Sequence, residues 1–274
     1  MADFYESALG FQRIAVEHLS GARAKENFGI GGRVLRVTLA LGMQRVTLVQ
    51  FVDQPGEPYP DDARSSDLIF QHFAIVVSDM AAAMAQLQGT SGWTPITRGG
   101  SQQLPASSGG VTAFKFRDPE GHPLELLAFP SDRTPKHWQG VSSESAFLGI
   151  DHSAISVRDT ARSVAYYAAL GLDVSTRSIN DDPAQVRLDH LDHPVVDVTA
   201  MSARESTPHL ELLCYRDGGN HRPLQLQPND VAATCLVFGV ASLTATHYAR
   251  ALPVVRHLQD PDGHHLAIVD VAIE

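Results

Sequence analysis

Apolar and polar residues alternate along several short stretches of the chain, which is the pattern of half-buried β-strands. The clearest stretch is Phe114–Phe129, FKFRDPEGHPLELLAF, in which two such runs flank a turn. Proline presets the first turn position, and glycine supplies the positive φ that other residues resist. A second stretch, Val254–Val269, repeats the turn as Asp-Pro-Asp-Gly-His. Both stretches are therefore predicted to be β-hairpins.

A second recurring pattern predicts a short strand that leads into a helix. His72–Asp79 reads HFAIVVSD and His152–Asp159 reads HSAISVRD. The final Asp of each can cap a helix, and helical spacing follows at Met80–Leu87 and Thr160–Leu170. A third version, Cys235–Ser242, has Cys where the other two have His.

These patterns combine into a unit of one strand, one helix and about three strands, which occurs four times. Tyr5–Phe11 (YESALGF) and Tyr166–Leu172 (YYAALGL) mark equivalent helix ends, and Val34–Asp53 is a further hairpin. Modules 1 to 4 cover residues 1–55, 68–130, 148–217 and 230–274, separated by polar or Pro-rich linkers at 54–67, 131–145 and 216–229. Module 1 lacks its first strand and module 4 is shortened.

Composition places the chain among soluble globular proteins. The length of 274 residues is enough for two domains. The residues are 43% hydrophobic and 19% charged, as in ordinary soluble globular proteins. A net charge of −10 argues against nucleic acid or an anionic membrane as a partner. Two cysteines imply no disulfide framework, and the N-terminal segment lacks the basic and apolar regions of a signal peptide. A cytoplasmic location is expected.

The four modules, the H-x-A-I-x-V-x-D strands and the Asp-Pro-x-Gly-His-x-Leu hairpins resemble the vicinal oxygen chelate superfamily. This group includes glyoxalase I, bleomycin resistance proteins and extradiol dioxygenases. The resemblance implies an α+β fold in which βαβββ modules pair into cup-shaped barrels. It also implies that metal ligands come from the first and last strands of each module. One fold hosts many functions, so the resemblance does not identify a substrate.

Carried over by position, the resemblance implies four metal ligands. The first strands supply His72 and His152, and the last strands supply Glu125 and Glu211. Glu125 already requires explanation, since a carboxylate within an apolar strand is costly unless paired, protonated or metal-bound. Modules 1 and 4 lack both ligand types. We therefore expect modules 2 and 3 to pair around one site and modules 1 and 4 to pair with each other, although neighbouring modules could pair instead.

Two imidazoles and two carboxylates suit a divalent Zn, Ni, Fe, Co or Mn ion. This set favours lyase or isomerase chemistry on a small substrate with vicinal oxygens, with Glu125 or Glu211 as the catalytic base. Three alternatives stay open: a bleomycin-resistance-type binding protein, an extradiol-type dioxygenase, and a scaffold whose His–Glu pairs only hydrogen-bond. Open strand edges around the missing strands leave room for a homodimer.

Three other features are interpreted as structural. The segment 189–193, with Asp189, His190 and His193, is predicted to be a polar loop rather than a surface metal site. Gly99–Gly110 is a polar loop that is either mobile or a lid over the site. Cys235 lies at a ligand position and is expected to be buried as a small apolar residue.

Overall fold

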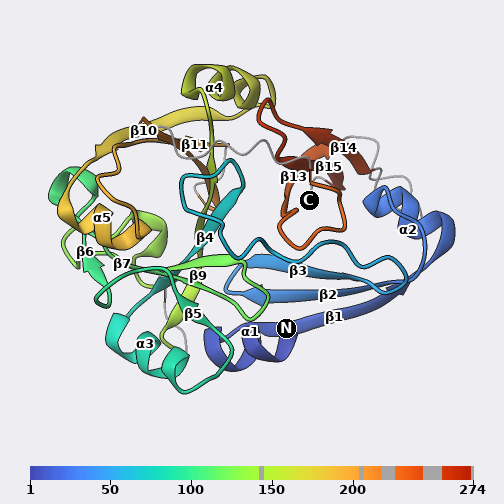
Figure 1. Cartoon of the computed structure of the whole chain (residues 1–274), viewed down its shortest axis with the longest axis horizontal. Coiled ribbons are helices and arrows are strands. Elements are labelled where there is room, and N and C mark those ends of the chain that lie inside the picture. The colour runs from blue at the N-terminus through green and yellow to red at the C-terminus, as the bar shows by residue number, and fades with distance from the viewer. Residues whose placement is uncertain (142–144, 204–206, 217–225, 243–254, 273–274) are drawn as a thin grey trace.

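The computed structural model describes residues 1–141, 145–203, 207–216, 226–242 and 255–272 (Figure 1). The α-helices are α1 (Ala2–Leu9), α2 (Gly21–Phe28), α3 (Met80–Gln88), α4 (Thr160–Ala169) and α5 (Pro183–Asp189). The strands are β1 (Gln12–Leu19), β2 (Val34–Leu41), β3 (Gln44–Phe51), β4 (Phe70–Val77), β5 (Thr94–Pro95), β6 (Gln102–Gln103), β7 (Thr112–Arg117), β8 (Pro123–Ala128), β9 (Phe147–Ser156), β10 (Asp173–Asn180), β11 (Val196–Ser202), β12 (His209–Tyr215), β13 (Cys235–Ser242), β14 (Val255–Gln259) and β15 (His265–Ala272). Two 3-10 helices are η1 (Ala106–Ser108) and η2 (Lys136–Trp138).

A nine-stranded sheet occupies the centre of the fold. Its order is β10-β11-β12-β9-β4-β8-β7-β5, with β6 beside β7. The first strands of modules 2 and 3, β4 and β9, pair antiparallel with each other. Strand β4 also pairs in parallel with β8, the last strand of module 2, and β9 pairs in parallel with β12, the last strand of module 3. Strands from residues 68–130 and 148–217 thus form one continuous sheet.

Two three-stranded sheets complete the fold, in the orders β1-β2-β3 and β13-β15-β14. Among the described residues these two sheets share no ladder, and their contact runs through α2 and β14. The predicted α+β class is confirmed, while the sheets stay open in the described part of the chain, without a closed barrel. No described helix is long and apolar enough to cross a membrane.

The helices α1, α3 and α4 cover one face of the central sheet. Alternation along β8 buries Leu124 and Leu126 on this face, where they share a cluster with Leu9 of α1 and Leu87 of α3. The predicted helix caps are confirmed, since the Asp79 and Asp159 carboxylates accept backbone N–H groups in the first turns of α3 and α4. The opposite face, which we call the site face, carries Glu125 and Glu211 beside two smaller apolar clusters that include Leu127 and Leu213.

Each Asp-Pro-x-Gly-His turn is tied to a helix of an earlier module. In the first turn, the Asp118 carboxylate accepts the backbone N–H of Glu120 at 2.9 Å and of His122 at 3.0 Å. It also accepts the hydroxyl of Tyr5 in α1 at 3.0 Å. The second turn repeats this contact, because Tyr167 of α4 donates to Asp260 at 3.0 Å. These turns therefore hold helices against the sheet.

Asp118 is expected to make the protein sensitive to acid. Burial opposes ionisation of Asp118, but His122 and the backbone N–H groups outweigh it and lower the pKa. A lowered folded-state pKa contributes stability above the unfolded value of about 3.9 and loses it as the pH falls through the folded value. In Asp118→Asn, the free energy of unfolding should therefore fall less steeply than in the wild type as the pH is lowered below about 4.

Urea unfolding of the wild type and Asp118→Asn across that pH range tests this expectation. Asp61→Asn, at an exposed position, controls for the loss of one negative charge. Equal pH slopes in all three proteins would contradict the role given to Asp118.

Several sequence predictions need correction. Residues 183–189 form helix α5, since Asp182 caps it and Pro183 occupies its first turn. Asp189 ends this helix and is 2% exposed, so it is not part of a polar loop. Cys235 is exposed instead of buried. Parts of the predicted linkers at 131–145 and 216–229, and residues 243–254 of module 4, lie outside the described residues.

Candidate metal centre

All four residues predicted as metal ligands lie on the site face of the central sheet. In the β4–β9 ladder, His72 is opposite Ala154 and His152 is opposite Ala74. The same two alanines neighbour Glu211 on β12 and Glu125 on β8, respectively. Alanines beside the four polar side chains leave space for these side chains to converge.

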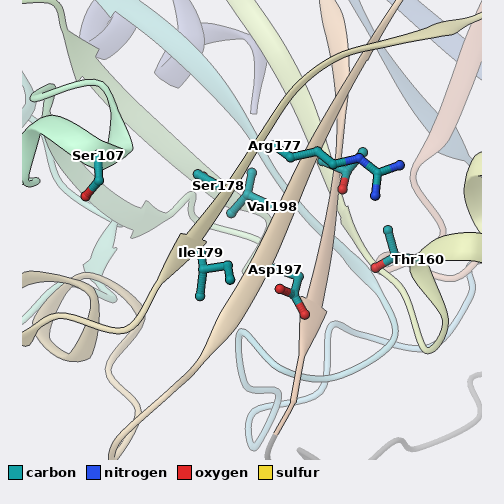
Figure 2. Close-up of a pocket in the computed structure, with 8 residues that line it drawn as sticks. Ser107, Thr160, Arg177, Ser178, Ile179, Asp197 and Val198 are labelled. Carbon is teal, nitrogen blue, oxygen red and sulfur yellow. The ribbon is translucent and has the colours of Figure 1, made fainter.

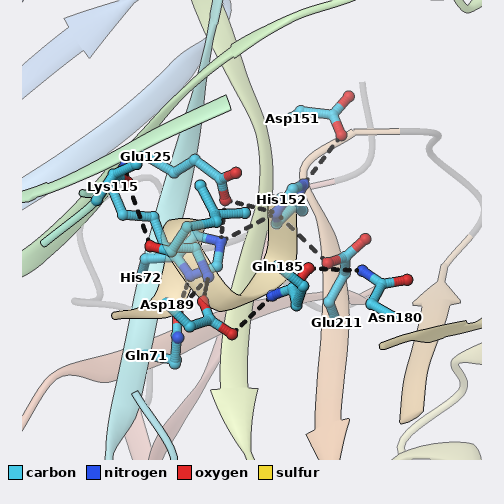
Figure 3. Close-up of polar contacts among 12 residues, drawn as sticks. Gln71, His72, Lys115, Glu125, Asp151, His152, Asn180, Gln185, Asp189 and Glu211 are labelled. Atoms are coloured by element: carbon cyan, nitrogen blue, oxygen red, sulfur yellow. Dashed lines mark hydrogen bonds and ion pairs between the residues drawn. The ribbon is translucent and has the colours of Figure 1, made fainter. Parts of the chain in front are cut away.

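The four side chains face one another (Figure 3), and three of them, His72, Glu125 and His152, each place a ligand atom within 4.8 Å of the other two. His72 Nε2 lies 2.5 Å from Glu125 Oε2 and 3.3 Å from His152 Nε2. His152 Nε2 lies 3.5 Å from Glu211 Oε2 and 4.0 Å from Glu125 Oε2. The side chains of His72, Glu125 and His152 are 2%, 6% and 7% exposed, whereas that of Glu211 is 21% exposed. Glu211 therefore lies on the most open side of the group.

A β-bulge precedes each of the two histidines. The ladder between β4 and β9 skips Gln71 and Asp151, so each bulged residue turns its side chain towards the histidine that follows it. Gln71 Oε1 contacts His72 Nδ1, and Asp151 Oδ2 lies 3.1 Å from His152 Nδ1. Neither residue was predicted from the sequence, although a polar residue directly before each His (Gln-His and Asp-His) was a visible signal.

This donor set fits a divalent transition metal. An acceptor at each Nδ1 favours the ring proton there, which would leave Nε2 to bind a metal, as in histidine metal ligands. Two such lone pairs and two carboxylates that face one another repel unless a cation or a proton lies among them. Bonds of about 2.1 Å in a tetrahedral site separate neighbouring ligand atoms by about 3.4 Å. Two separations here, 3.3 Å and 3.5 Å, are close to that value, whereas Glu125 Oε2 lies 2.5 Å from His72 Nε2 and 4.0 Å from His152 Nε2.

The charges around the site are unequal. Burial disfavours the imidazolium of His152, but the carboxylates of Glu211, Asp151 and Glu125 outweigh it and raise its pKa to about 9. Burial and the positive charge of Lys115 instead lower the pKa of His72. Without a metal, the proton is therefore held by His152, and a bound dication would displace it.

The two carboxylates are held in the ionised form. Burial raises the pKa of Glu125, yet His72 and Lys115 lower it further, to about 2. The pKa of Glu211 is also lowered against burial, by His152 and His209. His209, which the sequence analysis did not single out, places Nε2 at 3.5 Å from Glu211 Oε1. Glu211 is therefore the carboxylate with a second, partly exposed titratable neighbour.

The Gly99–Gly110 loop packs against α5. Leu104 joins Leu188 of α5 in one buried cluster, Gln102 Oε1 accepts from Arg187 Nε, and Ser108 donates to Asn180 at 2.7 Å. A separate surface hollow of about 670 Å³ runs along β10 and β11 (Figure 2). It is lined by Ser107, Thr160, Arg177, Ser178, Ile179, Asp197, Val198 and Thr199. The four converging side chains are not among these residues.

The fold is similar to that of proteins of the glyoxalase class. The model of the Glyoxalase/Bleomycin resistance protein/Dioxygenase superfamily matches residues 1–126, which confirms the resemblance seen in the repeats. A search of curated proteins finds no match.

Solved structures of this class have the same fold over nearly the whole chain. A point mutant of glyoxalase I from Zea mays matches with a TM-score of 0.62 and 15% identity, covering 98% of this chain and 86% of that chain. Glyoxalase I from Zea mays itself matches with a TM-score of 0.57, 16% identity and the same coverage. A putative dioxygenase from Bacillus subtilis matches with a TM-score of 0.57 and 13% identity, covering 98% and 79%. At these identities the likeness concerns the fold alone.

Proposed function

We propose that the protein is a metal-dependent enzyme of the lyase or isomerase type that acts on a small molecule with two neighbouring oxygens. The observation that carries this proposal is that His72, Glu125 and His152 each place a ligand atom within 4.8 Å of the other two, with Glu211 Oε2 3.5 Å from His152 Nε2. These residues would hold one divalent ion, and modules 2 and 3 would share it across the β4–β9 pair. The metal identity is not selected by this ligand set.

A bound divalent ion would supply Lewis-acid stabilisation of an oxyanion or enolate on the substrate. The protein's own residues divide the remaining work. Glu125 is closed in by His72 and Lys115 and holds no proton near neutral pH, since its pKa is about 2. Glu211 is more exposed and faces His209, and on this ground we assign it the role of taking a proton from a substrate carbon and returning it.

Metal analysis of protein purified without chelators tests the proposal. One equivalent of a divalent transition metal, with catalysed exchange of the α-hydrogens of hydroxyacetone in D2O, is the expected result. Tight binding of a metal-free apolar ligand would support a bleomycin-resistance-type binding protein instead. Protein that takes up neither metal nor ligand would support a scaffold.

A homodimer and a cytoplasmic location are also proposed. The outer strands β1, β3, β13 and β14 of the two small sheets have open edges in the described structure, and a second copy of the chain could pair with them. A cytoplasmic location agrees with the low cysteine content.

A further inference from the structure

A buried chain of hydrogen bonds connects helix α5 to the first histidine (Figure 3). Asp189 Oδ2 accepts the hydroxyl of Tyr215 at 2.9 Å, and this hydroxyl accepts Gln71 Nε2 at 3.2 Å. Gln71 Oε1 then contacts His72 Nδ1. Asp189, Tyr215 and Gln71 are 2%, 5% and 3% exposed, so water does not replace these bonds. The chain joins three elements, namely α5, β12 and β4.

Each bond in this chain sets the direction of the next. A carboxylate only accepts, so the single hydroxyl proton of Tyr215 points to Asp189 and its oxygen is left to accept from Gln71. The amide N–H₂ of Gln71 therefore faces Tyr215, and its carbonyl oxygen faces His72. When a metal binds Nε2 of His72, the ring proton is on Nδ1 and donates to that oxygen; without a metal, Glu125 Oε2 competes for the proton from 2.5 Å away from Nε2.

Lys115 supports the same orientation. Its ammonium lies 2.7 Å from Asp189 Oδ1 and 3.5 Å from Gln71 Oε1, so it balances the buried carboxylate and attracts the amide oxygen. Gln185 Nε2 also donates to Asp189 Oδ2, at 2.6 Å. Several donors thus hold the Asp189 carboxylate in place, and a buried charge is costly without such partners.

We propose that Asp189 is a positioning residue that acts through Tyr215 and Gln71 to set the metal-binding tautomer of His72. The inference rests on the proposed function, in which His72 holds a divalent ion. It gives α5, a helix of module 3, a role at a ligand of module 2. The carboxylate that orients the second histidine acts without intermediate residues, because Asp151 contacts His152 directly.

The test uses Asp189→Asn and Tyr215→Phe in the full chain, with Co2+ as the probe. An asparagine can donate to Tyr215 and so reverse every bond in the chain, whereas Tyr215→Phe interrupts the chain but keeps the Lys115–Asp189 ion pair. Both variants should weaken Co2+ binding by about 10- to 100-fold. Tyr5→Phe removes a matched buried hydroxyl–carboxylate bond of 3.0 Å to Asp118 and should leave the affinity unchanged.

Proton NMR of the Co2+ proteins supplies a readout that a structural role would not move. The wild type should show two exchangeable, paramagnetically shifted ring N–H signals, one from each histidine. In both variants the His72 signal should shift or disappear by exchange, while the His152 signal stays. Weaker binding with both signals unchanged, or unchanged affinity, would overturn the inference. Failure of the wild type to bind Co2+ would instead overturn the proposed function.

Discussion

His152→Ala is expected to abolish tight binding of a divalent transition metal, with the dissociation constant raised by more than about 100-fold. His152 is central to the group, because its Nε2 lies within 4.0 Å of His72, Glu125 and Glu211. Its removal leaves the carboxylates without the imidazole that stands among them. Titration of metal-free protein with Zn2+ or Co2+ by calorimetry measures the effect.

His264→Ala is the matched control for this loss. His264 is as buried as His152, at 7% against 6% exposed, but its Nε2 donates to the backbone carbonyl of Ser156 at 2.9 Å, in the second turn. The control should lose stability and keep its metal affinity. Equal affinity in His152→Ala and the wild type would show that the four side chains do not form one site.

The second large effect is a difference between substitutions of the two carboxylates: one should impair turnover and the other should impair metal binding. Glu211→Gln should lower kcat by about 10²- to 10⁴-fold, as expected for loss of a general base, while one equivalent of metal is retained. Glu125→Gln should mainly lose metal, since Glu125 is the buried partner of His72. The measurements are metal content and the rate of substrate α-hydrogen exchange, compared between the two variants.

A third variant, His209→Gln, separates proton transfer from metal binding, because His209 contacts Glu211 Oε1 whereas His152 contacts Glu211 Oε2. It should keep its metal and lose part of its rate. If Glu125→Gln keeps metal but loses turnover while Glu211→Gln stays active, the roles given to the two carboxylates are reversed.

The repeats in the sequence predicted most of what brings the candidate ligands together. The strands that carry His72 and His152, the caps at Asp79 and Asp159 and the hairpin that carries Glu125 all have local signals that the structure reproduces. These features depend on residue spacing within one strand or turn. These features can therefore be recognised in a single sequence, without an alignment of homologues.

The residues around the ligands could not be predicted in the same way. Strict alternation places Gln71 and His72 on opposite faces, and only the bulge in the β4–β9 ladder brings them together. The bulge depends on the register between two strands about 80 positions apart. Helix α5 had a local signal, Asp182-Pro183, but its contact with Lys115 crosses between modules and has no sequence pattern.

The most direct measurement is a crystal structure of the protein loaded with Co2+ or Zn2+, with diffraction data collected at the absorption edge of the metal. One anomalous peak is expected on the site face, about 2.0–2.3 Å from each of the four ligand atoms of His72, Glu125, His152 and Glu211. Absence of a peak there, or a peak bound by only one of the two histidines, would contradict a site shared by β4 and β9.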